Sequence, residues 1–342
     1  MRELRRGRFP IAAATAIGRR QLLLAIGAAS LWSPSLLFAQ QPQRVYRIGF
    51  LIPPREAGGR AFVDAFREGL SELGYVEGRN VTIDFRFGDD DLTRLPGLAV
   101  DMVRQHPDVI VTASAPGVRA VMEATRTIPI VIGAVYDPVG QGFVASLGRP
   151  GGNVTGLSVQ YEDTIPKLLE LIRAVLPSTT KLAVLRTVDP SHDNFLTRIA
   201  ALARPMQIQI APIGANAPAE LEGAFARISE AQSEALIVLP HPLFNSRPDV
   251  VVGLAAARRL PAVYPFRSYA EAGGLISFGI DIAKSFRRAA YYVNRILKGA
   301  KPADLPVEQP TKIDLVVNLK AAKDLGIKIP QSVLLRADDV IQ

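Results

Sequence analysis

The feature that most constrains the fold is a regular alternation of short apolar runs with amphipathic helical segments, which begins near Arg44. Val45–Ile52 has the length and composition of a buried parallel strand. The segment after it places Phe62, Phe66 and Leu70 on one face at helical spacing. One strand and its helix together occupy about 25–30 residues, which is the size of a right-handed crossover between parallel strands. The alternation therefore predicts an α/β protein whose sheets are mostly parallel.

The alternation occurs in two successive runs, which predicts two open α/β lobes. The first run ends near Val135 and the second extends from Lys167 to Gly279, with Pro150–Gly152 between them. We interpret Pro150–Gly152 as a crossing between the lobes and as a hinge, with a second hinge near Asp281. A single barrel of strand–helix units is the structural alternative, because about 250 residues suffice for one. The order of elements breaks down after Gly279, which favours the two lobes.

Composition excludes several classes of site. The 342 residues contain no cysteine and three histidines, which removes zinc fingers, iron–sulfur clusters and thiol nucleophiles. The formal net charge is +8, but six arginines and only one acidic residue lie within residues 1–39, so most of the excess belongs to that segment. The rest of the chain is nearly balanced, and no helix-turn-helix pattern precedes the first strand. We therefore expect no nucleic-acid partner.

Residues 1–39 have the pattern of a secretory signal. An arginine-rich segment ends at Arg19-Arg20, an apolar run covers Leu22–Ala29, and a small residue precedes a cleavage site before Gln40. The apolar run is much shorter than the roughly 20 residues that span a bilayer, which argues against the alternative of a membrane anchor. We predict a cleaved signal, export by the Sec or the twin-arginine route, and a periplasmic protein that begins near Gln40.

The sequence carries no recognisable signature of catalysis. The patterns G-x-S-x-G, G-x-x-x-x-G-K-[ST] and H-E-x-x-H do not occur. Ser191, His192 and Asp193 are consecutive, and consecutive side chains cannot converge as a catalytic triad. His241, flanked by prolines at a strand end, is the one candidate acid–base group, and no nucleophile accompanies it. We therefore expect neither catalytic residues nor a cofactor or metal.

Candidate ligand-binding residues are those that follow the carboxyl ends of the predicted strands, where open α/β sheets bind ligands. Ser114 and Ala115, followed by Pro116, begin a helix whose free N–H groups can bind a carboxylate or phosphate. The alternative is that Ser114 only caps its own helix. Asp137 and Asp281 each follow a strand and can hold an ammonium group, or each can cap a helix instead.

Three further residues complete the predicted site. Phe266 and Tyr269 are expected to form an aromatic wall, the alternative being that they belong to the core. His241 lies at the end of another predicted strand and is expected to contact the ligand. An anionic site, a cationic site and an apolar wall together describe an amino acid with an apolar or aromatic side chain.

Four segments of the chain are similar to a known family: Asp137–Gly140, Gly148–Gly156, Tyr264–Gly274 and Ile296–Lys320. They resemble the ABC-transporter substrate-binding family that includes the tryptophan-binding TrpX-like proteins, and the resemblance extends over essentially all of the chain after the signal. It implies two flavodoxin-like lobes of the type I periplasmic-binding-protein kind, joined by three crossings, with a ligand cleft between them. It also implies no cofactor and no catalysis.

By this resemblance lobe 1 is 44–156 plus 283–342, and lobe 2 is 157–282. The return of the chain to lobe 1 would explain the break in the alternation after Gly279. His241 departs from the family pattern, in which an acidic or small polar residue is expected.

The resulting hypothesis is a monomeric periplasmic solute-binding protein. It would deliver a small ligand, an amino acid or a similar small carboxylate, to an ABC permease in the membrane by hinge closure. One alternative is a periplasmic sensor module that docks on a receptor. Another is a hydrolase that uses His241 with Asp137 or Asp281.

Overall fold

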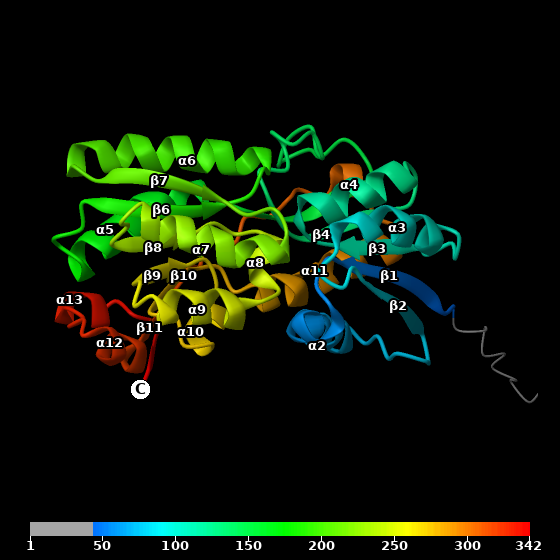
Figure 1. The fold of residues 1–342 in the computed structure, drawn as a ribbon. Helices are drawn as coiled ribbons and strands as arrows, with labels where there is room; N and C mark the ends of the chain where they lie inside the picture. The colour runs from blue at the N-terminus through cyan, green and yellow to red at the C-terminus, as the bar shows by residue number, and fades with distance from the viewer. Residues whose placement is uncertain (1–43) are drawn as a thin grey trace, which may run out of the picture. The chain divides into compact units, whose positions relative to one another are not determined.

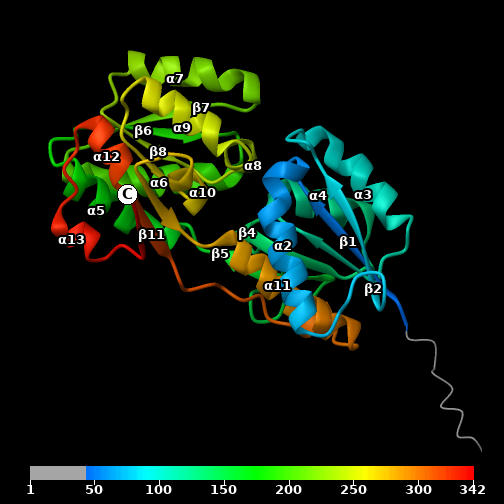
Figure 2. The same cartoon turned by 90° about the horizontal axis from the view of Figure 1, so that it is seen from below.

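The computed structural model describes residues 44–342, so the predicted signal at 1–39 lies outside the described residues. Within that range the chain folds into two lobes, each a sheet with helices on both faces (Figure 1 and Figure 2). Both sheets are open, which excludes the single-barrel alternative. Within the described range we find no helix that is both long and apolar enough to cross a membrane.

Lobe 1 is built on a parallel sheet with the strand order β2-β1-β3-β4-β5. Its strands are β1 (Tyr46–Ile52), β2 (Val81–Phe87), β3 (Val109–Thr112), β4 (Ile130–Tyr136) and β5 (Val154–Val159). The helices on one face are α2 (Glu56–Glu72) and α11 (Ile282–Leu297), and those on the other are α3 (Leu95–Val103) and α4 (Ser114–Ala124).

Helix α11 belongs to lobe 1 although it lies far along the chain. The ring of Phe286 on α11 packs 5.4 Å from that of Phe50 on β1 and stacks 5.2 Å from that of Phe62 on α2. A side chain at Gly69 of α2 would collide with the backbone oxygen of Arg287, so glycine allows the two helices to pack closely. Each buried phenylalanine contributes about 1.5–3 kcal/mol, which fixes α11 against this sheet.

Lobe 2 is built on a sheet with the order β12-β11-β10-β9-β8-β6-β7, in which only β10 and β11 pair antiparallel within the described chain. Its strands are β6 (Lys181–Arg186), β7 (Gln209–Gly214), β8 (Ala235–Val238), β9 (Ala262–Tyr264), β10 (Ile276–Gly279), β11 (Asp314–Asn318) and β12 (Asp339–Ile341).

The helices of lobe 2 cover both faces of that sheet. On one face lie α5 (Ile165–Val175), α6 (Pro190–Ala203), α12 (Leu319–Leu325) and α13 (Gln331–Leu334). On the other face lie α7 (Leu221–Glu230), α8 (Pro242–Asn245), α9 (Pro248–Ala257) and α10 (Arg267–Glu271).

Between residue 44 and the C-terminus the chain passes from lobe to lobe three times. It crosses after β5 near Gln160, after β10 at Ile280–Asp281, and before β11 at 309–313. The crossing predicted at Gly151-Gly152 is wrong. The N–H of Gly151 donates to the Ala303 oxygen at 3.3 Å, and β5, which follows, still pairs with β4 in lobe 1.

The end of the chain corrects the predicted lobe boundaries. Of the segment 283–342, which we expected in lobe 1, only the first part packs there, as α11. The connector after α11 leads back to lobe 2, where β11 and β12 extend the sheet beyond β10 (Figure 2). Leu315 and Val317 are buried in the core of lobe 2. β11 pairs antiparallel with β10, and β12 pairs parallel with β11.

Candidate ligand-binding cleft

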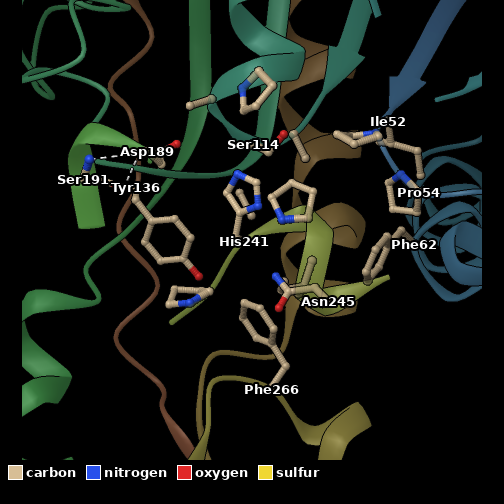
Figure 3. A pocket seen from close by; sticks show the side chains of 18 of the residues that line it. Ile52, Pro54, Phe62, Ser114, Tyr136, Asp189, Ser191, His241, Asn245 and Phe266 are labelled. Carbon is tan, nitrogen blue, oxygen red and sulfur yellow. Dashed lines mark hydrogen bonds between the residues drawn. The ribbon is translucent and has the colours of Figure 1, made fainter. Parts of the chain in front are cut away.

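The carboxyl ends of strands from both lobes face a common cleft (Figure 3). Its lining includes Pro53 and Pro54 after β1, Ala113–Pro116 after β3, Pro240–Pro242 after β8, and Phe266 after β9. The space among these side chains, open to solvent at its mouth, is about 720 Å³. This volume includes the solvent at the mouth, so it describes the cleft and its opening together.

The lobe 1 side of the cleft has a cluster of unpaired donors, which we call the α4 cradle. Ser114 is the first residue of α4 and has a φ of +61°. The N–H groups of Ser114 and Ala115 belong to the first turn of the helix, where the backbone has no intrahelical acceptor for them, and both residues line the cleft. Pro116, which follows, has no N–H. The hydroxyls of Ser114 and Thr112 are buried, and neither has a hydrogen-bond partner among residues 44–342. A Cβ on Gly117 would come 2.7 Å from Thr112 Oγ1, so glycine keeps this space open.

The α4 cradle is suited to a carboxylate. The side chain of Ser114 makes no capping bond, so the alternative that it only caps its helix is not what the structure shows. Free amides and the helix dipole attract an anion, and the hydroxyl of Ser114, which lines the cleft, can donate to it. A buried polar group without a partner costs about 1–3 kcal/mol, and a bound carboxylate would recover that cost.

The lobe 2 side of the cleft contributes a carboxylate that the sequence analysis missed. Asp189 precedes α6, and its Oδ1 accepts hydrogen bonds from the N–H of Ser191 at 2.9 Å and from its hydroxyl at 2.6 Å. Burial raises the pKa of Asp189, but the bonds from Ser191 and the nearby His192 and His241 outweigh it and lower the pKa below its usual value. Asp189 is therefore ionised, and both bonds leave Oδ2 free to meet a cation.

His241 is held neutral at the centre of the cleft wall. Its Nδ1 accepts a hydrogen bond from the N–H of Leu243 at 3.2 Å, which places its proton on Nε2. Burial, together with His192 at a ring distance of 5.7 Å, lowers the pKa of His241 to about 4, although Asp189 opposes this shift. His192 is fully buried, with Nδ1 accepting from the N–H of Thr187 and Nε2 bonded to the Pro240 oxygen.

The remaining lining is largely aromatic. Phe62, Tyr136, Phe266 and Phe286 come from both lobes and line the cleft (Figure 3). The prediction of an aromatic wall singled out Phe266 correctly and missed Phe62 and Tyr136. Tyr269 lies behind the wall: its buried hydroxyl donates to Asn245 Oδ1 at 2.9 Å, and Asn245 lines the cleft.

The structure brings four of the seven predicted site residues to the cleft lining, namely Ser114, Ala115, His241 and Phe266. Tyr269 reaches it only through Asn245. The pairing of His241 with Asp137 or Asp281 that the hydrolase alternative requires is absent from the described cleft, because neither carboxylate lines it.

The amine-binding role predicted for Asp281 is not supported by its position. Its Oδ1 accepts from the N–H of Lys284 at 3.2 Å and caps α11, which is the alternative that we considered. Its Oδ2 pairs with Lys284 Nζ at 3.0 Å, in a separate groove at the crossings. Asp137 instead closes a turn, with Oδ1 accepting from the N–H of Gly140 at 2.8 Å.

An ion pair joins the two lobes beside the cleft. The carboxylate of Asp90 in lobe 1 is 3% exposed and lies 3.4 Å from Arg247 Nε of lobe 2 and 3.7 Å from Arg55 Nε. The N–H of Arg55 also donates to Asp90 Oδ1 at 3.2 Å. We call this arrangement the Asp90 latch. Separation of the lobes would break the bond to Arg247 and leave the others intact.

The low pKa of His241 predicts that the folded protein loses stability in mild acid. The unfolded chain binds a proton at this imidazole near pH 6.5, whereas the folded state keeps it neutral down to about pH 4. The free energy of unfolding should therefore fall as the pH decreases from 6.5 to 4, by about 3 kcal/mol from this group. His241→Asn, which keeps an acceptor for the Leu243 N–H, should flatten the dependence in urea unfolding series. An unchanged slope would contradict the assignment.

The chain has clear relatives. Residues 55–341 match the family described as ABC transporter substrate binding protein. The tyrosine-binding protein of Clostridioides difficile (strain R20291) is 28% identical over 266 residues, which cover 77% of this chain and 76% of that protein. The ABC domain in complex with L-Trp from Streptococcus pneumoniae is 27% identical, covers 87% of this chain and 100% of its own, and superposes with a TM-score of 0.81. A conserved domain protein from Vibrio cholerae is 30% identical at the same coverage, with a TM-score of 0.82.

The chain therefore belongs to the ABC transporter substrate-binding protein family. This confirms the predicted class and the fold of two type I periplasmic-binding-protein lobes around a cleft. It also supports the transport role over the sensor and hydrolase alternatives.

Proposed function

We propose that the protein binds an α-amino acid with a large apolar or aromatic side chain in the cleft and passes it to an ABC permease. The observation that carries the proposal is the distribution of charge across the cleft. The α4 cradle on lobe 1 offers donors for a carboxylate, Asp189 on lobe 2 offers an anion for the ammonium group, and aromatic side chains line other parts of the cleft. The similarity to a tyrosine-binding protein and to a domain in complex with L-Trp supports the same ligand class.

Asp189 replaces Asp137 and Asp281 in this proposal as the residue that binds the amine. Among the described residues that line the cleft it is the only carboxylate. His241 acts here as a hydrogen-bond donor and not as an acid or base, so we propose that the protein is not an enzyme.

The direct test is calorimetry with the standard amino acids and with simple carboxylates and amines. We expect binding to need both charged groups, so an aromatic amino acid binds while the corresponding deaminated acid and decarboxylated amine do not. Tight binding of a ligand without an amine would refute the amino-acid assignment. Mass spectrometry of small molecules that co-purify with the native protein would identify the ligand independently.

We further propose export, because the signal pattern at 1–39 matches the periplasmic or extracellular location of binding proteins that serve importers. N-terminal sequencing of the protein from a periplasmic extract should begin near Gln40. Recovery of the full-length chain in the cytosol would contradict this location. A monomer is expected, and light scattering would test it.

Closure of the lobes on the ligand is expected to depend on the Asp90 latch. Arg247→Gln removes the charge that joins the lobes and touches none of the residues that we propose for the ligand. It should shift the lobes toward the open state and weaken ligand binding about three- to tenfold, with faster dissociation. Stopped-flow fluorescence would measure the rate.

The matched control for the latch is Arg258→Gln, since Arg258 pairs with Glu222 at 2.8 Å inside lobe 2. It should leave both affinity and dissociation rate unchanged. If both variants behave like the parent, the latch does not contribute to closure.

A further inference from the structure

Two side chains on one wall of the cleft are oriented by the protein so that each leaves a hydrogen-bond donor for the ligand. His241 immediately precedes α8 and Asn245 is its last residue, so the two are four positions apart and lie on one side of that short helix. Figure 3 shows the imidazole and the amide on the same wall, with Phe62 and Tyr136 on either side of them. We call this pair the α8 wall.

Tyr269 fixes the orientation of the Asn245 amide. Its side chain is fully buried, and its ring stacks 4.9 Å from that of Tyr264 at an angle of 14°. The Tyr269 hydroxyl has no acceptor other than Asn245 Oδ1 within residues 44–342. A buried O–H without an acceptor costs about 1–3 kcal/mol, so the amide keeps its oxygen toward Tyr269. Nδ2 of Asn245, with its two hydrogens, is then left for the cleft.

A backbone hydrogen bond likewise determines which nitrogen of His241 can donate to the ligand. The N–H of Leu243 donates to Nδ1, and the imidazole is neutral above about pH 4, so its proton is on Nε2. Within residues 44–342 the His241 ring makes only this side-chain hydrogen bond, so the Nε2 N–H is left for the ligand. In the α8 wall, the Leu243 N–H therefore occupies Nδ1 of His241, and Oδ1 of Asn245 is turned toward Tyr269, so the groups left for the ligand are N–H donors.

We propose that the α8 wall selects amino acids whose side chain carries a hydrogen-bond acceptor, such as a phenolic oxygen, at its far end. This inference rests on the proposed function, because it takes the carboxylate to bind the α4 cradle and the side chain to extend along the cleft. A wholly apolar side chain leaves the two donors without partners. A side chain that ends in a donor places N–H against N–H. Both are penalised, because a site built to form a hydrogen bond rejects ligands that cannot complete it.

The test compares three ligands of nearly equal size: L-tyrosine, L-phenylalanine and 4-amino-L-phenylalanine. They share the α-carboxylate and ammonium groups and differ only in the ring substituent. The hydroxyl of L-tyrosine can accept and donate a hydrogen bond, L-phenylalanine has no substituent, and the amine of 4-amino-L-phenylalanine chiefly donates. Calorimetry on the whole protein should give L-tyrosine an affinity at least about tenfold higher than either of the others. The ratio of affinities cancels any effect on the α-carboxylate and ammonium sites.

The informative variant is Asn245→Asp, which keeps an oxygen for the Tyr269 hydroxyl and replaces the cleft-facing donor with an acceptor. In this variant 4-amino-L-phenylalanine should bind more tightly than L-phenylalanine, because the N–H groups of its amine gain an acceptor. Tyr269→Phe removes the contact that orients the amide, and it should lower the preference for L-tyrosine over 4-amino-L-phenylalanine severalfold without changing the lining of the cleft.

The outcomes distinguish failure of the α8 wall from failure of the proposed function. If all three ligands bind with equal affinity, or if Asn245→Asp leaves their order unchanged, the α8 wall does not select the ligand and the amino-acid site still stands. If none of them binds to the folded protein but another amino acid does, this inference fails and the proposed function stands; if no amino acid binds, both fail.

Discussion

Asp189→Asn is expected to weaken the binding of the amino acid by about ten- to a hundredfold. A hydrogen bond between charged groups contributes about 1.5–3 kcal/mol, and each 1.4 kcal/mol changes an affinity tenfold. The fold should be unaffected, because asparagine keeps the oxygen that accepts from the N–H of Ser191 and caps α6. Calorimetry would measure the affinity, and thermal unfolding would confirm the stability.

The matched control for this change is Asp281→Asn. Both aspartates cap a helix through Oδ1, but Asp281 lies in the groove at the crossings and not in the cleft. The control should bind the ligand as tightly as the parent. If Asp281→Asn weakens binding and Asp189→Asn does not, the cationic group of the ligand lies elsewhere and our reassignment is wrong.

A negative charge at the α4 cradle is expected to abolish binding. Ser114→Asp places a carboxylate where we propose the ligand carboxylate. Two like charges about 4 Å apart near a protein surface repel by about 4 kcal/mol. We therefore expect the affinity to fall by at least about a hundredfold relative to Ser114→Asn, which has the same size without the charge.

Aspartate and asparagine both tolerate the positive φ of residue 114, so neither variant should unfold the protein. The comparison of the two isolates charge from size. Equal binding by the two variants would mean that no anionic group of the ligand reaches Ser114. The backbone N–H groups of Ser114 and Ala115 would then have no role in binding the ligand.

The sequence by itself determined the kind of fold. Local composition predicted β1 within one residue of its ends, because a strand buried on both faces is apolar along most of its length. It missed α8, α10, α12 and α13, which have between four and seven residues. Such short helices have too few turns to show a repeating apolar face, and packing rather than propensity stabilises them.

Part of the site was also accessible from the sequence. The carboxyl end of a strand is where an open sheet binds its ligand, and this rule selected Ser114, Ala115, His241 and Phe266, which line the cleft. The same rule could not distinguish Asp189 from Asp281. Both are aspartates at helix starts after strands, and only their tertiary surroundings differ.

Tertiary structure alone decided which lobe each late segment joined and which polar groups face the ligand. The sequence of β11 would suit a strand in either lobe, and only the folded structure shows it paired with β10 in lobe 2, with Leu315 and Val317 in the core there. The donor character of Asn245 depends on Tyr269, and the neutrality of His241 depends on its burial beside His192. Periodicity and motif depend on neighbours along the chain, whereas sheet edges, hydrogen-bond partners and desolvation depend on residues that are brought together only by folding.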